Sequence, residues 1–249
     1  MKKYSIAILG IGGVGGYIGG KLAASHVPGV RIIFVARGET REVLQKDGLR
    51  LITEDGEIVA RPDLVSDDPA EIGPVDLLIC AMKGYDLEAG LTAYRGCLAA
   101  GTVILPLLNG IGIADKVRAI VPGIECWDGL IYIVARQTGK GIVRQTGALR
   151  EIVFGSAKAS PGDLQKVASI FGSADMKATV ADNIDLELWR KFLFISVMAT
   201  LTCYYRSPIG EIRRDPERAR NIPNLLHELQ SVAVANGIAI TDELMTAVR

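Results

Sequence analysis

Apolar residues in the first half of the chain form short continuous runs, and segments with a helical pattern separate these runs. Each run is rich in Val, Ile and Leu and has the length of a strand that is buried on both faces. The runs cover residues 4–9, 30–36, 75–81 and 102–105. The predicted helices cover residues 13–25, 39–46, 86–98 and 113–120. This alternation predicts a doubly wound α/β fold with a parallel sheet.

Further strands are predicted outside this alternation. Residues 49–53 and 57–60 flank Asp55-Gly56, a sequence typical of a β-hairpin turn. Residues 126–154 have a strand-like pattern with glycine turns, and we expect them to extend the sheet in antiparallel fashion. A helix and a last strand follow, over residues 162–172 and 177–180.

The pattern changes after Asp182. Residues 185–204 are expected to form one long helix that is very apolar in its second half, and Pro216 suits the first position of another helix. That helix could continue through residues 225–235, with Pro223 as a break or a fresh start. The α/β domain and the all-helical domain predicted in this way cover residues 1–181 and 182–249.

Composition excludes several classes of function. The 249 residues are 49% hydrophobic, which is enough for one large domain or for two modest domains with cores of their own. The formal net charge is zero, with 28 basic and 28 acidic residues, so we expect neither a nucleic-acid surface nor a polybasic membrane patch. The apolar run over residues 192–201 is too short to span a bilayer. Four cysteines without a CxxC pair and only two histidines predict a reduced, cytoplasmic protein without a metal site.

A glycine-rich loop follows the first predicted strand and opens the first helix. The loop is a GxGxxG sequence made of Gly10, Ile11, Gly12, Gly13, Val14 and Gly15. In this strand–loop–helix context it is typical of a dinucleotide-binding Rossmann domain, because the helix N-terminus can bind a pyrophosphate. Gly10 would permit the tight turn, Gly12 the approach of the ligand, and Gly15 close packing of the helix. A glycine turn without a ligand is the alternative.

The end of the second strand distinguishes NADPH from NADH. Enzymes that use NAD usually have an acid there, which binds the ribose 2′-hydroxyl. This chain has Arg37 instead, whose guanidinium would bind a 2′-phosphate, and Arg41 could help one helical turn later. We therefore favour NADPH as the cofactor, although Arg37 could also be a solvated loop charge.

Three further residues are candidates for the chemistry. Lys83 and Asn109 follow successive strands, and ligands bind at the carboxyl ends of the strands in such sheets. Ordinary loop polarity is the alternative for both. Lys191 begins a very apolar helical stretch, where burial would lower the pKa of its amine and let it act as a proton donor. From the pattern alone, a lysine that extends to solvent is the more common outcome.

Taken together, these segments resemble the ketopantoate reductase (2-dehydropantoate 2-reductase) family over nearly the whole chain. The resemblance is carried by the glycine loop, Ala36-Arg37-Gly38, Lys83-Gly84-Tyr85-Asp86, Leu108-Asn109-Gly110, Leu188-Trp189-Arg190-Lys191 and Ser207-Pro208-Ile209-Gly210-Glu211-Ile212. It implies a Rossmann domain followed by a helical domain that serves substrate binding and allows a homodimer. It also implies NADPH-dependent reduction of a 2-oxo acid, 2-dehydropantoate, to pantoate in pantothenate and coenzyme A biosynthesis.

The resemblance implies roles for individual residues. Lys191 would be the general acid, and Arg37 would hold the 2′-phosphate. Lys83 and Asn109 would contact both cofactor and substrate near the nicotinamide. Two lysines near a 2-oxo acid could neutralise its carboxylate and the charge that develops on its ketone oxygen.

The chain departs from the family pattern at its predicted substrate site. Well-studied members have asparagines where this chain has Ile195, Ala199 and Ile209. Ser196, Thr200 and Ser207 are nearby polar residues that could replace them. The predicted pocket is therefore less polar than in the family, which makes a more apolar 2-oxo acid an alternative substrate.

The second departure is length. Family members continue beyond the point where this sequence stops, at Arg249, and the additional segment carries a serine and a glutamate of the active site. We therefore expect the helical domain to be truncated here, with apolar faces of its last helices exposed. Two other functions remain open, namely a β-hydroxyacid-type dehydrogenase of the same architecture and a non-catalytic protein that senses NADPH.

Overall fold

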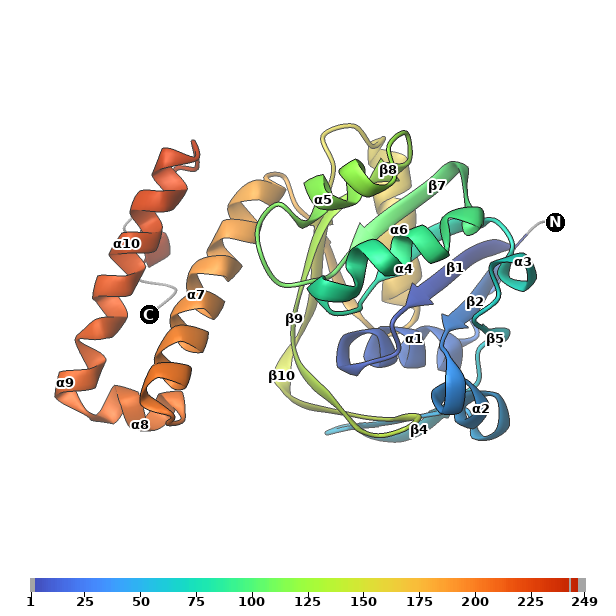
Figure 1. The fold of residues 1–249 in the computed structure, drawn as a ribbon, viewed down its shortest axis with the longest axis horizontal. Helices are drawn as coiled ribbons and strands as arrows, with labels where there is room; N and C mark the ends of the chain where they lie inside the picture. The colour runs from blue at the N-terminus through green and yellow to red at the C-terminus, as the bar shows by residue number, and fades with distance from the viewer. Residues whose placement is uncertain (1–2, 242, 246–249) are drawn as a thin grey trace. The chain divides into compact units, whose positions relative to one another are not determined.

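The structure, a computed structural model, describes residues 3–241 and 243–245. The chain divides into two compact units, one that reaches to Asp182 and one that begins at Asn183. The first unit contains both helices and strands, whereas the described part of the second contains helices (Figure 1). This combination confirms the predicted fold class, a Rossmann-type domain followed by a helical domain.

The centre of the first unit is a parallel sheet of six strands in the order β5-β2-β1-β6-β7-β8. The strands are β1 (Tyr4–Leu9), β2 (Val30–Val35), β5 (Leu64–Ser66), β6 (Val75–Cys80), β7 (Leu98–Pro106) and β8 (Glu125–Cys126). All pairings within this sheet are parallel. The order runs outward from β1 in both directions, as the doubly wound prediction requires.

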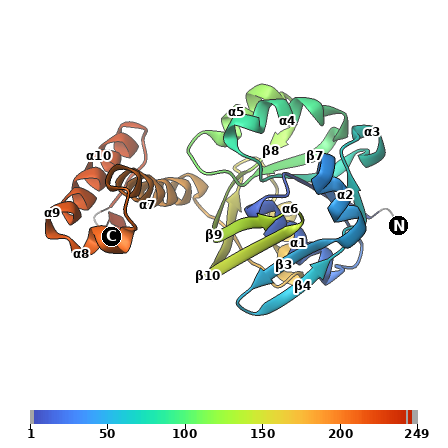
Figure 2. The same cartoon turned by 60° about the horizontal axis from the view of Figure 1, so that its bottom comes forward.

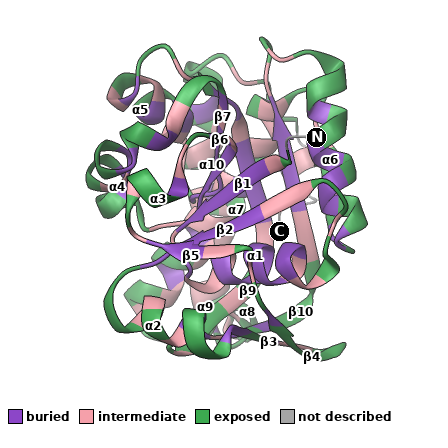
Figure 3. Ribbon diagram, turned by 90° about the vertical axis from the view of Figure 1, so that its right-hand side faces the viewer, coloured by how far each residue is buried: buried purple, intermediate pink, exposed green. Residues whose placement is uncertain are grey.

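Alternate residues of β1 supply two separate cores, one on each face of the parallel sheet. Ile6 and Ile8 belong to the cluster on one face, whereas Ala7 and Leu9 belong to the cluster on the other. The central strands β1 and β6 are accordingly buried at all but one position each (Figure 3). Helices α3 (Pro69–Ile72), α4 (Leu87–Ala93) and α5 (Ile113–Ile120) contribute to the second cluster.

A second sheet lies beside the first and contains the long hairpin of the unit. It consists of β3 (Leu49–Thr53), β4 (Gly56–Ala60), β9 (Asp128–Gly139), β10 (Ile142–Gly155) and β11 (Lys177–Val180). The expectation that residues 126–154 extend the first sheet is therefore wrong for most of that segment. The hairpin instead pairs through β10 with β3 and β11, because these strands offer partners that the local pattern could not indicate.

Helix α1 (Gly13–Ser25) lies between the two sheets and contacts strands of both (Figure 2). Glycines make this close approach possible. A Cβ at Gly16 would lie 2.5 Å from Val143 Cγ2 of the second sheet, and one at Gly19 would lie 2.6 Å from Phe34 Cε1 of the first. Since real Cβ atoms do not approach this closely, glycine at these positions sets the distance between the sheets.

Two local predictions differ from the structure. The helix expected over residues 86–98 ends at Ala93, and a 3-10 turn (Arg95–Cys97) leads directly into β7. The residues between β4 and β6 form β5 and α3, which the pattern did not indicate. Strand β5 is only three residues long, too short to show a period, and is identified by its pairing with β2. The other helices of this unit are α2 (Gly38–Asp47) and α6 (Pro161–Ser173).

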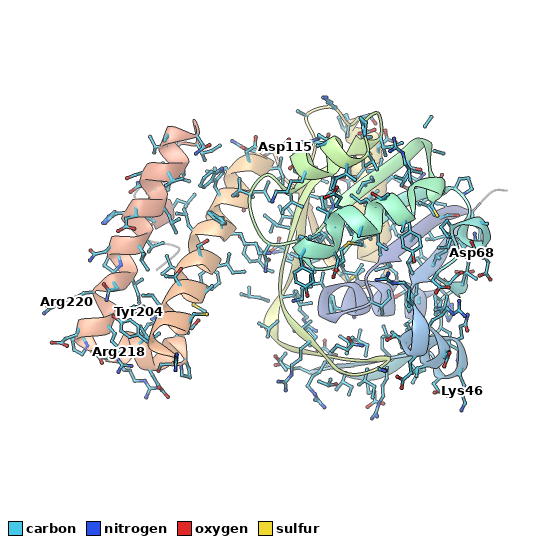
Figure 4. The ribbon with its side chains drawn as sticks, viewed as in Figure 1. Lys46, Asp68, Asp115, Tyr204, Arg218 and Arg220 are labelled. Carbon is cyan, nitrogen blue, oxygen red and sulfur yellow. The ribbon has the colours of Figure 1, made fainter. Side chains whose placement is uncertain are left out.

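The second unit begins with the long helix α7 (Ile184–Tyr205), which packs against α10 (Asn221–Ala235). The Asn183 side chain caps α7 by accepting a hydrogen bond from the Leu186 amide at 3.1 Å. Between the two long helices lie α8 (Ile209–Arg214) and α9 (Pro216–Ala219). The helix expected to run on from Pro216 is therefore interrupted after four residues. Tyr204 at the end of α7 and Arg218 on α9 are labelled in Figure 4.

We expect Phe154→Ala to destabilise the first unit strongly. Phe154 is fully buried, stacks on Trp127 with ring centroids 5.8 Å apart, and meets Phe171 edge-on. Removing such a ring leaves a cavity, so the free energy of unfolding in urea should fall by about 3–5 kcal/mol. The control is Leu149→Ala on the same strand, where the side chain is 66% exposed and the expected change is below about 0.5 kcal/mol. Equal effects of the two changes would contradict this account of the core.

Candidate functional site

A pocket of about 760 Å³ opens at the carboxyl edge of the parallel sheet in the first unit. Its lining includes residues that follow four neighbouring strands of the sheet and two residues of β9. These are Gly10 to Val14 after β1, Ala36 and Arg37 after β2, Ala81 to Lys83 after β6, Leu107 to Asn109 after β7, and Ala135 and Gln137 of β9. A crevice at this edge is where doubly wound sheets bind ligands, so this pocket is the candidate site.

The glycine loop forms one wall of the pocket, and its glycines differ in what surrounds them. Gly10 has φ of +100°, and a Cβ there would lie 2.8 Å from the Met82 amide nitrogen. A Cβ at Gly15 would overlap the Gly10 carbonyl oxygen, so Gly15 lets α1 start directly on the loop. At Gly12, by contrast, a Cβ would meet no atom within 4 Å. The space beside Gly12 belongs to the pocket, where a ligand can reach the backbone.

The amino end of α1 faces this pocket without a side-chain cap. Gly12 is the N-cap residue, and among the described residues the helix has no side-chain cap hydrogen bond. The first amides of the helix and the helix dipole favour an anion in the pocket. The local geometry is therefore that of a phosphate-binding helix terminus.

A cation also lines the pocket, just after the end of β2. Arg37 follows β2, precedes α2 and is exposed to solvent. No described residue forms an ion pair with it. Arg41, by contrast, donates a hydrogen bond through Nη1 to Asp67 Oδ1. Its predicted help in binding the 2′-phosphate stays a prediction.

Lys83 and Asn109 line the same pocket, as expected from their positions after β6 and β7. The structure thus brings together in one pocket both residues, Arg37 and all of the predicted glycine-loop residues except Gly15. Sequence patterns did not single out Thr40, Tyr94, Ala135 and Gln137, which also line it. Thr40 lies one helical turn after Arg37, so its sequence position could have predicted that it lines the pocket. The β9 residues reach the pocket through long-range strand pairing, which no local sequence pattern predicts.

Lys191 lies on α7 in the second unit and is 8% exposed. Burial lowers the pKa of its amine from the usual 10.5 to about 8. The alternative of a lysine that extends to solvent is therefore wrong. An amine with this pKa changes its protonation near neutral pH and could donate a proton in a reaction.

Four further positions of the predicted substrate site lie on α7, whereas Ser207 follows this helix and Ile209 begins α8. Ile195 and Ala199 follow Lys191 at intervals of four, so the three share one helix face. Ser196 is half-buried and Thr200 is exposed. The face that carries the amine is thus apolar one and two turns later, and hydroxyl groups lie beside it.

The two units match sequence profiles of one family in succession. Residues 6–159 match the profile described as ketopantoate reductase PanE/ApbA, and residues 183–249 match its C-terminal counterpart. The chain belongs to the ketopantoate reductase family. This match confirms the resemblance found in the sequence. Members of the family use NAD(P)H, which confirms a nicotinamide dinucleotide as the cofactor.

Relatives in the family include proteins of known structure. The chain is 33% identical to 2-dehydropantoate 2-reductase from Porphyromonas gingivalis W83, with a TM-score of 0.91 over 99% of this chain and 87% of that one. It is 28% identical to the uncharacterized oxidoreductase YkpB of Bacillus subtilis, over 93% of this chain and 75% of the relative. It is 26% identical to 2-dehydropantoate 2-reductase from Halobacterium salinarum, over 98% and 80% respectively.

The described residues contain neither a candidate membrane span nor a candidate metal site. No helix in this part of the chain is long and apolar enough to cross a membrane. Within residues 3–241 and 243–245, no group of three or more His, Cys, Asp or Glu side chains is placed to hold a metal ion.

We expect Gly12→Val to impair cofactor binding without unfolding the protein. The new side chain would occupy the open space beside the backbone that the pyrophosphate should approach, so the dissociation constant for NADPH should rise roughly tenfold or more. The free energy of unfolding should change by less than about 1 kcal/mol, because the free protein has room for the side chain. Fluorescence titration with NADPH and urea unfolding measure the two effects.

Gly101→Val on β7 is the matched control for this change. Gly101 also has no atom within 4 Å of an added Cβ, but it does not line the pocket. Its substitution should leave the dissociation constant unchanged. Unimpaired binding by Gly12→Val would show that the pyrophosphate does not approach this part of the loop.

Proposed function

We propose that this protein reduces a 2-oxo acid to a 2-hydroxy acid with NADPH. The observation that carries the proposal is a single pocket that joins the uncapped amino end of α1 to the unpaired guanidinium of Arg37. These groups match the two anionic parts of NADPH, the pyrophosphate and the 2′-phosphate. The absence of an acid at the end of β2 supports NADPH over NADH.

The cofactor supplies a hydride, which reduces the ketone carbon of the substrate. In this proposal Lys191 donates the accompanying proton to the ketone oxygen, and its amine must therefore be protonated before the reaction. Lys83 and Asn109 lie at the sheet edge that lines the pocket, where an ammonium and an amide can hold the substrate and the adjoining part of the cofactor. Residues 1–181 would thus bind the cofactor, and residues 182–249 would contribute to substrate binding and to a homodimer.

We propose 2-dehydropantoate as the substrate, which places the protein in pantothenate and coenzyme A biosynthesis. The names of the relatives from Porphyromonas gingivalis and Halobacterium salinarum support this choice. A more apolar 2-oxo acid is the second candidate, because Ile195 and Ala199 continue the helix face of Lys191 without polar groups. In that case Ser196 and Thr200 would supply the remaining hydrogen bonds to the substrate.

We expect Lys191→Met to lower kcat/KM for the 2-oxo acid by roughly a hundredfold or more, because it removes the amine that donates the proton to the ketone oxygen. The dissociation constant for NADPH should stay within about twofold, since the cofactor groups named above lie elsewhere.

In the unchanged protein, kcat/KM should fall as the pH rises through about 8, where the Lys191 amine loses its proton. Stopped-flow and steady-state absorbance of NADPH between pH 6 and pH 10, a range of about four units, measure this pH dependence and the loss of kcat/KM in Lys191→Met.

Lys158→Met is the control, because Lys158 is exposed and belongs to no predicted site. It should leave kcat/KM and the pH profile unchanged. A Lys191→Met protein with normal turnover would remove the lysine from the mechanism.

A panel of substrates tests the substrate class. NADPH oxidation should be observed with 2-dehydropantoate and with 2-oxo acids that lack its hydroxyl group, but not with 3-oxo acids, and 3-hydroxy acids should not reduce NADP+. If the apolar face of α7 contacts the substrate, Ile195→Asn should raise the ratio of kcat/KM for 2-dehydropantoate over 2-oxo-3-methylbutanoate by roughly tenfold, because an amide would gain a hydrogen bond to the hydroxyl. Turnover of 3-hydroxy acids would favour a β-hydroxyacid dehydrogenase instead, and tight NADPH binding without any turnover would favour a sensor.

A further inference from the structure

Two carboxylates lie close to Arg37 at the predicted 2′-phosphate end of the pocket. Asp67 directly follows β5, and β5 pairs with β2 so that Ser66 lies opposite Val35, two residues before Arg37. Glu39 lies in the first turn of α2, two residues after Arg37. An acid at this edge is the feature by which NAD-dependent enzymes bind the ribose 2′-hydroxyl. The pairing of β5 with β2 thus places an acid beside the end of β2, where the sequence of β2 itself has none.

Both carboxylates already have cationic partners other than Arg37. Arg41 forms an ion pair through Nη1 with Asp67 Oδ1, and Lys140 forms one with Glu39 Oε2. The Arg41 and Asp67 side chains are 38% and 30% exposed, so this pair is partly shielded from water. Because the acids are neutralised in this way, Arg37 keeps its charge available for an anion in the pocket.

The charge of Asp67 acts on Tyr94, a residue of the pocket lining. Tyr94 lines the pocket and is 5% exposed. Burial raises the pKa of its hydroxyl, the charge of Arg37 lowers this pKa, and the charge of Asp67 raises it. Arg37 and Asp67 therefore act on the same wall of the pocket with opposite sign, and an unpaired Asp67 would repel a phosphate bound there.

Arg41 is partly buried, and neighbouring contacts fix the elements on either side of its ion pair. Its Nε atom is buried and has no hydrogen-bond partner among the described residues, so the side chain is not free in solvent. One turn later on α2, Gln45 Nε2 donates a hydrogen bond to the Val65 carbonyl of β5 at 2.9 Å. On the other side, Asp68 caps α3 by accepting a hydrogen bond from the Ala70 amide at 2.8 Å, at the position labelled in Figure 4. These contacts fix α2 and the residue after Asp67 around the ion pair.

We propose that Arg41 is a positioning residue for cofactor choice, which acts by neutralising Asp67 rather than by contacting the cofactor. With Arg41 in place, Arg37 binds the 2′-phosphate of NADPH without competition. Without it, the charge of Asp67 would compete for Arg37 and oppose binding of the 2′-phosphate. This inference rests on the proposed function, in which Arg37 binds the 2′-phosphate.

The test is a double-mutant cycle on the full chain, with Arg41→Leu, Asp67→Asn and the double variant. Dissociation constants for NADPH and NADH are measured from nicotinamide fluorescence, a probe common to both cofactors. In Arg41→Leu the constant for NADPH should rise roughly tenfold while that for NADH stays within about twofold, because only the 2′-phosphate is repelled. In the double variant the constant for NADPH should return to within about twofold of the unchanged protein.

Other outcomes overturn the proposal. If the double variant binds NADPH as weakly as Arg41→Leu, Arg41 contacts the phosphate itself. If Arg41→Leu weakens both cofactors equally, the residue only holds α2 on β5. Gln45→Leu is the matched control for that case, since it removes another contact between α2 and β5 without changing charge. Arg41→Lys keeps the charge and should retain most of the preference for NADPH.

The proposed function has its own readout in the same experiment. If the unchanged protein binds NADH as well as NADPH, the proposed preference for NADPH is wrong. The role of the pair is decided separately, by whether Arg41→Leu changes the ratio of the two constants and whether the double variant restores it.

Discussion

The close packing of α1 between two β-sheets is the constraint on which the rest of the first unit depends. Gly16 and Gly19 let the helix lie against both sheets at distances that any side chain would prevent. The helix must then begin where β1 ends, and Gly15 allows this start because its missing side chain leaves room for the Gly10 carbonyl. The uncapped amides at the start of α1 thereby face the pocket, so the packing of the core and the capacity to bind a phosphate have the same origin.

The charges around the pocket are arranged by tertiary contacts. Arg37 carries a positive charge near two acids, Glu39 in the same segment and Asp67, which the pairing of β5 with β2 brings close. The fold places Arg41 on Asp67 and Lys140 on Glu39. A surface of almost balanced charge can therefore present a local cation to the pocket, which is where an anionic cofactor needs it.

The second unit provides a different kind of electrostatic control. Lys191 is buried on a long helix whose next turns carry Ile195 and Ala199 on the same face. Loss of hydration destabilises the ammonium form and brings the pKa down to about 8. An amine of this kind can be protonated under ordinary conditions and still release its proton readily, as a general acid requires.

The amino-acid sequence alone determined the main elements of this protein. The short apolar runs predicted the central strands, and the context of Gly10 to Gly15 predicted the turn from β1 into α1, because both depend on interactions between neighbouring residues. Arg37, Lys83 and Asn109 could be named because each follows a strand, and the carboxyl ends of parallel strands meet at one edge.

Only the tertiary structure decided which distant segments lie together. Strand β5 is recognisable only through its pairing with β2, and the hairpin of β9 and β10 forms a second sheet because β3 and β11 are available as partners. The ion pair of Arg41 with Asp67 and the burial of Lys191 likewise join or enclose residues that no local pattern relates. Hydrogen-bond partners, ion pairs and burial arise from contacts between segments far apart in the chain, so they become defined only when the chain is folded.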